Sequence, residues 1–231
     1  MSEQTGPFLR QIRSFVRREG RMTPSQKRAM EVLWPLYGVG NDISIIDLPV
    51  LFGRSADCIL EIGFGMGNSL AEMARARPGV NFLGIEVHRP GVGHLLNLIE
   101  QQQLSNVRII CDDAVDVLRT RIPADSLSGV NLFFPDPWPK KKHHKRRIVQ
   151  PEFVALIHAR LKPGGILHMA TDWQAYAEHM LVVMQQADGF ENLSSSGDYV
   201  ERPQVRPLTK FEQRGQRLGH GVWDLQFRRQ P

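Results

Sequence analysis

The sequence predicts an α/β fold with a doubly wound, mostly parallel, seven-stranded sheet, preceded by an N-terminal helical arm. From Cys58 onward, short apolar runs alternate with longer mixed segments, as expected for consecutive βαβ units. The first apolar run leads directly into a glycine-rich turn at Gly63, a common start for a helix in such sheets. Because parallel strands are joined by right-handed crossovers, helices should cover the sheet.

Residues 1–35 are expected to form a basic N-terminal arm and a helix, followed by one domain over residues 36–231. Thr23 is a favourable N-cap residue, Pro24 suits the first helical position, and residues 26–34 have helical spacing. The arm lacks the apolar core of a secretory signal, and no stretch approaches the length of a membrane span.

In the main domain, strands are expected over residues 58–62, 80–86, 107–111, 129–134 and 164–171. Helices are expected over residues 67–77, 91–103, 113–121, 148–161 and 173–187. Residues 189–195 and 221–228 have the pattern of two further strands, separated by a polar loop over residues 197–219. That loop is too long for a simple hairpin, which indicates a functional role.

The charge is arranged as basic patches on an acidic body. Residues 10–28 hold seven Lys/Arg and one Glu, residues 138–147 hold six Lys/Arg and no acid, and residues 201–231 hold seven Lys/Arg and three acids. One such run is commonly a solvated surface, but three on an acidic background favour a nucleic-acid partner. Cys58 and Cys111 lie far apart in apolar runs, which indicates buried thiols in a reducing, cytoplasmic compartment.

The segment Glu61-Ile62-Gly63-Phe64-Gly65-Met66-Gly67 is expected to hold a cofactor. Gly63 and Gly65 let a ligand approach the backbone, and the helix that follows offers free N–H groups. The spacing is G-x-G-x-G, whereas dinucleotide-binding dehydrogenases usually have G-x-G-x-x-G. Glycine spacing alone does not identify the ligand, so the neighbouring acids carry the inference.

Acidic residues follow three successive strands, at the edge where ligands of open α/β sheets bind. Glu61 ends the first strand, Glu86 ends the second, and Asp113 follows the third just before Ala114. Glu86 is suited to two ribose hydroxyls and Asp113 to an adenine amino group, with the Ala114 N–H facing a ring nitrogen. Each acid alone is as well explained by a helix cap or a surface charge. Their joint placement favours a cationic cofactor with hydroxyl groups over a phosphate.

The fourth strand ends at Pro135-Asp136-Pro137-Trp138, which should place Asp136 beside the cofactor. The two prolines restrict the backbone on both sides of Asp136, so its carboxylate is aimed before a substrate arrives. An Asx-type turn at a strand exit is the structural alternative. A cationic run over residues 140–147 follows at once, which suggests chemistry on a polyanion.

The glycine loop and the three acids resemble class I S-adenosylmethionine-dependent methyltransferases, which have a Rossmann-like sheet. The resemblance narrows over residues 133–147, Phe-Phe-Pro-Asp-Pro-Trp-Pro-Lys-Lys-Lys-His-His-Lys-Arg-Arg, with Thr171-Asp172 and Thr209-Lys210-Phe211-Glu212 later. These motifs are similar to those of bacterial tRNA (guanine-N7-)-methyltransferases, from about residue 25 to residue 228. The resemblance implies methyl transfer from S-adenosylmethionine to N7 of a guanine in the variable loop of tRNA.

The residues and the resemblance together assign three groups of side chains. The cofactor group is Glu61, Gly63, Gly65, Glu86, Asp113, Ala114 and Asp136, and Asp136 is also catalytic. The resemblance implies a substrate group, which is Lys140, Asp172, Thr209, Lys210, Phe211 and Glu212. The RNA group is Lys142, His143, His144, Lys145, Arg146 and Arg147. No metal site, membrane or obligate protein partner is expected, since adjacent histidines do not easily serve one tetrahedral ion.

Guanine N7 has an in-plane lone pair and no proton, so methyl transfer to it needs alignment but no general base. Positive charge moves onto the purine as the bond forms, and a fixed carboxylate such as Asp136 can stabilise that charge or hold the base in line. Asp172 or Glu212 can accept from guanine N1–H and its amino group. The cationic run holds phosphates, while Trp138 either stacks on a base or packs beneath the loop.

Two alternative functions stay open. The first is an amino-group methyltransferase, because Asp-Pro-Pro-Tyr-like motifs at the same strand end hold exocyclic amines; the order Pro-Asp-Pro-Trp at residues 135–138 argues against it. The second is an RNA-binding module whose methyltransferase-like core has lost catalysis. The intact acids at Glu61, Glu86, Asp113 and Asp136 argue against that reading.

Overall fold

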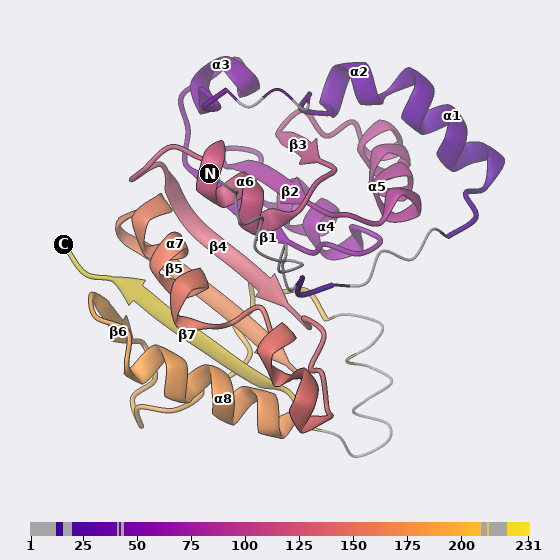
Figure 1. Cartoon of the computed structure of the whole chain (residues 1–231). Helices are drawn as coiled ribbons and strands as arrows, with labels where there is room; N and C mark the ends of the chain where they lie inside the picture. Colours follow the sequence, from indigo (N-terminus) through magenta and orange to yellow (C-terminus); the bar gives the residue numbers. More distant parts are fainter. Residues whose placement is uncertain (1–12, 16–19, 41, 43, 209–211, 213–220) are drawn as a thin grey trace, which may run out of the picture.

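The structure is a computed structural model that describes residues 13–15, 20–40, 42, 44–208, 212 and 221–231. Within these ranges the sheet has seven strands in the order β3-β2-β1-β4-β5-β7-β6, with helices on both faces (Figure 1). The strands are β1 (Cys58–Ile62), β2 (Asn81–Ile85), β3 (Val107–Ile110), β4 (Leu127–Phe133), β5 (Leu161–Thr171), β6 (Phe190–Asn192) and β7 (Trp223–Arg229).

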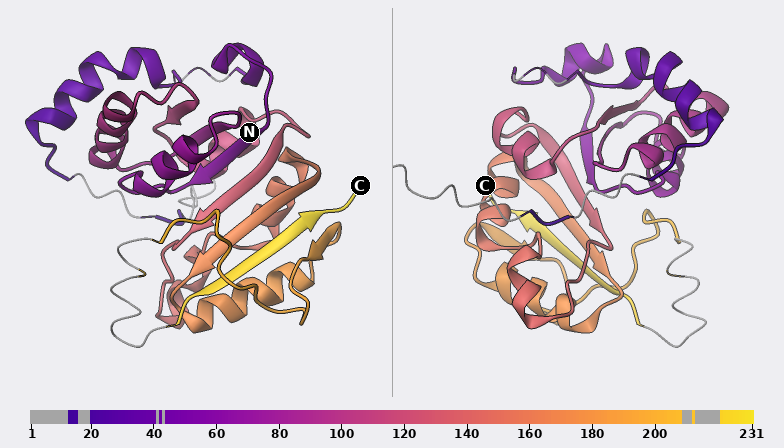
Figure 2. Two further views of the ribbon diagram at one scale, coloured as in Figure 1. Left: turned by 180° about the vertical axis from the view of Figure 1, so that it is seen from behind. Right: turned by 45° about the vertical axis from the view of Figure 1, so that its right-hand side comes forward.

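Strands β1 to β5 pair in parallel, whereas β7 is antiparallel to both β5 and β6. Figure 2 shows β7, in yellow, beside β5 in both views. Because β7 runs backward, its first residue, Trp223, pairs with Thr171 at the carboxyl edge of the parallel strands. The predicted doubly wound, mostly parallel fold is confirmed.

The helices are α1 (Pro24–Val32), α2 (Trp34–Tyr37), α3 (Leu48–Phe52), α4 (Asn68–Ala76), α5 (Arg89–Gln102), α6 (Ala114–Thr120), α7 (Pro151–Arg160) and α8 (Gln174–Gln185), with a 3-10 helix, η1 (Lys141–Arg146). The last two predicted strands shift by a few residues. Strand β6 is shorter than predicted because the Asn192 side chain accepts the Ser194 N–H at 2.9 Å and turns the chain. Helices α3 and η1 had no counterpart in the predicted elements.

The N-terminal helix begins as predicted, because Thr23 and Gln26 form a reciprocal capping box. It ends two residues early, at Val32, and a separate turn of helix, α2, follows with Pro35 near its start. Helix α1 packs on α5, where Arg28 and Glu100 form an ion pair at 2.7 Å. These contacts place α1 above the edge of the sheet that carries β2 and β3 (Figure 1).

The sheet separates two apolar layers, as expected for parallel strands buried on both faces. One layer joins α1, α4 and α5 to side chains such as Phe82 and Ile109. The other joins α3, α6, α7 and α8 to side chains such as Leu60 and Leu83. Among the described helices, none is both long and apolar enough to cross a bilayer.

Candidate active site

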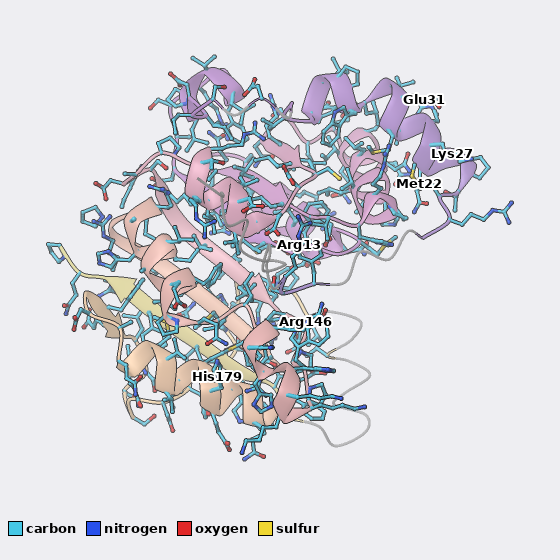
Figure 3. The ribbon with its side chains drawn as sticks, viewed as in Figure 1. Arg13, Met22, Lys27, Glu31, Arg146 and His179 are labelled. Atoms are coloured by element: carbon cyan, nitrogen blue, oxygen red, sulfur yellow. The ribbon has the colours of Figure 1, made fainter. Side chains whose placement is uncertain are left out.

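A cavity of about 1480 Å³ opens at the carboxyl edge of the parallel strands. One wall comes from the ends of β2 and β3, at residues 86–90 and 111–112, and the opposite wall is residues 136–139 after β4. Helix α1 and the residues just before it contribute a third wall, where Met22, Lys27 and Glu31 are labelled in Figure 3. The cavity therefore joins one predicted cofactor acid, Glu86, to the predicted catalytic segment, whereas Glu61 and Asp113 are not part of its lining. Sequence patterns indicated helix α1 but not its place over this cavity.

The glycine loop after β1 leaves open space for a ligand. Gly63 and Gly65 have φ of 70° and 58°, and a Cβ at either position would meet no atom within 4 Å. Gly67 is tighter, because a Cβ there would lie 2.7 Å from the Leu95 Cβ. The first two glycines thus border open space, and the absence of a side chain at the third allows α4 and α5 to pack.

Glu61 is buried beneath this loop, with 3% of its surface exposed, and its Oε2 atom has no hydrogen-bond partner. Burial, reinforced by the nearby charge of Glu86, raises the pKa of Glu61 to about 8. A buried carboxyl group without a partner is costly unless a ligand supplies a donor or a positive charge. The buried carboxyl group beneath the loop therefore fits S-adenosylmethionine, whose sulfonium and amino groups are cationic.

Glu86 is held in a fixed orientation by backbone donors. Its Oε2 accepts the Gly65 N–H at 2.8 Å, and its Oε1 accepts the N–H groups of Val87 and His88 at 2.7 and 2.9 Å. These bonds tie the ends of β1 and β2 together. A carboxylate held in this way keeps lone pairs for ribose hydroxyls without any rearrangement of its side chain.

Asp113 caps helix α6, because its Oδ1 accepts the Val115 N–H at 3.0 Å, and burial raises its pKa above the ordinary value. The residue before it, Asp112, lines the cavity, and its Oδ1 accepts the Asp113 N–H at 2.8 Å. Asp112 was not among the predicted site residues. The sequence has two adjacent acids after β3, Asp112 and Asp113, and the sequence analysis assigned a ligand contact to the second alone.

Asp136 is exposed at the cavity wall, on a segment with unusual backbone geometry. Phe134 and Trp138, on either side of it, have φ of 52° and 45°, in the left-handed region that bulky residues avoid. Phe134 is held there by its N–H bond to the Ala170 carbonyl at 2.8 Å. Strained residues of this kind cluster at functional sites, and here they enclose the proline-flanked carboxylate.

The cationic run forms η1, and its side chains differ in exposure. Lys140, Lys141, Lys142 and Lys145 are exposed, as expected for phosphate contacts. Burial and the surrounding lysine and arginine charges lower the pKa of His143. The run thus presents a lysine surface to solvent.

Two arginines of the run make internal contacts. Arg146 lies over the Trp138 ring at 3.9 Å and donates to the carbonyls of Arg13 and Phe15 at 3.2 and 3.1 Å, next to Arg13 in Figure 3. Trp138 Nε1 donates to the Ser14 carbonyl at 3.0 Å, so its ring packs in the loop. Arg147, predicted to contact RNA, is 3% exposed and donates to the Pro137 carbonyl at 3.0 Å.

The predicted substrate residues are spread over three segments. Lys140 is exposed before η1, and Asp172 is exposed after β5. Thr209, Lys210 and Phe211 lie outside the described residues. Glu212 is 2% exposed and forms two hydrogen bonds of 2.7 and 2.8 Å with Arg206, a buried partner that the sequence analysis did not single out. In the part of the chain that is described, no three His, Cys, Asp or Glu side chains are grouped to hold a metal ion.

Comparison with known proteins shows the family of the chain. The profile of a family described as "Putative methyltransferase" matches residues 55–225. The tRNA (guanine-N(7)-)-methyltransferase of Alcanivorax borkumensis is 59% identical over 97% of this chain and 94% of its own length. The proteins of that name from Salmonella typhimurium and Escherichia coli are 60% and 59% identical over 98% of this chain and 95% of their own length.

Solved structures share the fold at low identity. The 16S rRNA methyltransferase KamB superposes with a TM-score of 0.58 at 17% identity, over 84% of this chain and 99% of its own. The [4+2]-cyclase SpnF superposes with a TM-score of 0.52 at 19% identity, over 76% of this chain and 75% of its own. Since a cyclase shares the fold, the fold alone does not fix the reaction. The family match and the close relatives do: the chain belongs to the tRNA (guanine-N7-)-methyltransferase family.

Proposed function

We propose that the protein transfers a methyl group from S-adenosylmethionine to N7 of a guanine in tRNA, and that this guanine lies in the variable loop. The observation that carries the proposal is the single cavity that joins Glu86 and Asp112 to Asp136, with the exposed lysines of η1 beside it. The names of the close relatives support the same activity. A cytoplasmic location and action without an obligate protein partner belong to the proposal.

The cofactor is held by Glu61, Gly63, Gly65, Glu86, Asp113 and Ala114, with Asp112 added from the cavity lining. S-adenosylmethionine supplies an electrophilic methyl group on a sulfonium centre. Glu61, unpaired beneath the loop, faces a positive charge of the ligand, and Glu86 accepts from the ribose hydroxyls. The Gly63 and Gly65 backbone allows the ligand to lie against the chain without a steric clash.

Asp136 acts on the base. Guanine N7 attacks with its own lone pair, so no residue of the chain has to remove a proton. As the bond forms, positive charge develops on the purine, and the Asp136 carboxylate, fixed between two prolines, stabilises it without reorganising. The same rigidity holds the base in line with the methyl group, which is where most of the catalytic advantage of positioning arises.

The RNA side consists of exposed cations and the segments around them. Lys142 and Lys145, with His143 and His144, contact phosphates, which gives affinity and orientation but no base selection. Lys140 and Asp172 border the base-binding side, and Thr209, Lys210 and Phe211 belong to the same side, while Glu212 anchors that motif against the buried Arg206. The basic arm and helix over residues 1–35 add a further surface of positive charge, and residues 36–231 form the methyltransferase domain.

Methyl transfer to unmodified tRNA transcripts, followed by nucleoside analysis, tests the proposal. We expect 7-methylguanosine as the product, and cleavage of the labelled tRNA at that base should map it to the variable loop. A methyl group on an exocyclic nitrogen would support the amino-group alternative instead. Calorimetry with S-adenosylmethionine separates the remaining reading, because an RNA-binding module without catalysis would show no binding heat.

A further inference from the structure

Arg206 stands at the centre of a buried group of charges behind the catalytic segment. Its side chain is fully buried, as are the carboxylates of Glu212 and Asp224, each about 2% exposed. Its Nε and Nη2 donate to the two oxygens of Asp224 at 2.7 and 2.8 Å. Its Nη1 and Nη2 donate to the two oxygens of Glu212 at 2.7 and 2.8 Å. One planar guanidinium therefore binds two carboxylates at once.

The same guanidinium lies against the turn that leads to Asp136. Its Cζ atom is 5.9 Å from the ring centre of Phe133 and 5.6 Å from that of Phe134. Phe134 is the residue with φ of 52°, two positions before Asp136. A bulky residue in this conformation persists only where its surroundings over-determine it. The Arg206 cation, the Ala170 carbonyl and the apolar layer that contains α1, α4 and α5 all contact Phe134.

A third set of contacts ties this group to the sheet. Asp224 lies in β7 opposite Ala170 of β5, and its Oδ1 is 2.7 Å from His168 Nε2. The His168 ring meets the Phe133 ring edge-on, with the ring centres 4.9 Å apart. The cluster of Arg206, Glu212, Asp224 and His168 thus touches the catalytic turn from two sides, through both phenylalanine rings.

Stability alone is a weak reason to keep such a cluster. Buried ion pairs of this type often contribute no more to folding than apolar side chains of the same volume, because desolvation offsets their attraction. What an arginine with two carboxylates does provide is fixed geometry between three segments, since its planar fork allows one arrangement. The three segments joined here are the Phe133–Phe134 turn, the start of β7 and the end of the Thr209–Glu212 motif.

We infer that Arg206 is a positioning residue for methyl transfer: it fixes the turn that aims Asp136 and holds Glu212, the described residue of the Thr209–Glu212 motif. This inference rests on the proposed function, in which Asp136 and that motif face the guanine. Arg206 itself is fully buried and touches neither substrate nor cofactor. It acts through the residues that do.

The test is Arg206→Lys, which keeps the charge and loses the fork. We expect its single-turnover rate of methyl transfer, at saturating tRNA and S-adenosylmethionine, to fall about tenfold to a hundredfold. The dissociation constants for both ligands should stay within about twofold of the parent values, because neither binding surface is removed. The matched control is Arg121→Lys: Arg121 is also buried, 4% exposed, but it donates to the carbonyl of Gly40, in the segment that bridges to β3.

A parent-like rate for Arg206→Lys, or an equal loss of rate in Arg121→Lys, would overturn the inference. If Arg206→Lys does not fold, Asp224→Asn provides a second test, because it leaves the arginine in place and weakens one of its two partners. We expect a smaller loss of rate with unchanged affinities. An unchanged rate would count against the positioning role. The parent protein is assayed in parallel on the same tRNA. If it makes no 7-methylguanosine, the proposed function fails; if it does and the variants match it, only the positioning role fails.

Discussion

The wild-type protein should release a proton from Glu61 when S-adenosylmethionine binds, and the Glu61→Gln variant should not. In the free protein, burial raises the pKa of Glu61 to about 8, from an ordinary value of 4.5. At pH 7 about nine in ten molecules therefore carry a protonated Glu61. A cationic ligand beside it favours the ionised form, so binding at pH 7 should release about 0.9 proton per cofactor.

The same linkage sets the pH dependence of affinity. Between pH 8 and pH 6 the ionised fraction of Glu61 falls from about one half to about one hundredth, so cofactor affinity should weaken about 50-fold. Calorimetry at pH 7 in two buffers with different heats of ionisation counts the protons. Glu61→Gln retains any proton linkage that belongs to the cofactor, so the difference between the two proteins isolates Glu61. Equal proton release in both would refute this assignment.

Unfolding without ligand gives an independent check, with a definite sign. A carboxyl group whose pKa is raised by folding contributes stability that is complete below its unfolded pKa, near 4.5, and that is lost as pH rises through the folded pKa, near 8. Glu61→Gln should therefore gain stability relative to the parent between pH 5 and pH 9, with little difference at pH 4. Urea unfolding at these three pH values measures it.

Three further predictions concern the catalytic turn, the glycine loop and the cationic run. Asp136→Asn should lower the single-turnover rate about a hundredfold or more while tRNA affinity is unchanged, because the carboxylate acts on charge that develops only during transfer. Gly91→Ala should weaken S-adenosylmethionine binding in calorimetry, since its Cβ would collide with the Gly65 carbonyl and push the loop. In filter binding, Lys142→Ala with Lys145→Ala should reduce the salt slope of tRNA binding by about 1.5, whereas Arg146→Ala alone should reduce it by less than about 0.5 because Arg146 already binds backbone carbonyls.

The parts of the site that follow one strand were predictable, and the parts that join distant segments were not. Glu61, Glu86 and Asp136 lie where strand periodicity and the glycine turn placed them. The left-handed backbone at Phe134 was not predictable, because no residue type with that preference occupies the position. The contact of Trp138 with Ser14 spans 124 residues, so local sequence patterns do not predict it. The order of Lys and Arg in the cationic run also does not show which of these side chains are buried. Pattern analysis reads neighbours in sequence, whereas these features depend on neighbours in space.

With the proposed site residues, the reversed direction of β7 separates cofactor binding from base binding along the chain. The acids at the ends of β1, β2 and β3 that we propose for cofactor binding fall between residues 61 and 113, in the N-terminal part of the sheet. Because β7 is antiparallel, the chain between β5 and β7 leaves and returns at the edge where the base is handled. A gene recombination that joins the first half of one family member to the second half of another would therefore exchange how the base is chosen while the cofactor is inherited intact. On the proposed roles, the residues that handle the base, from Asp136 to Phe211, lie in one contiguous stretch of the chain, and only the phosphate contacts of residues 1–35 lie outside it.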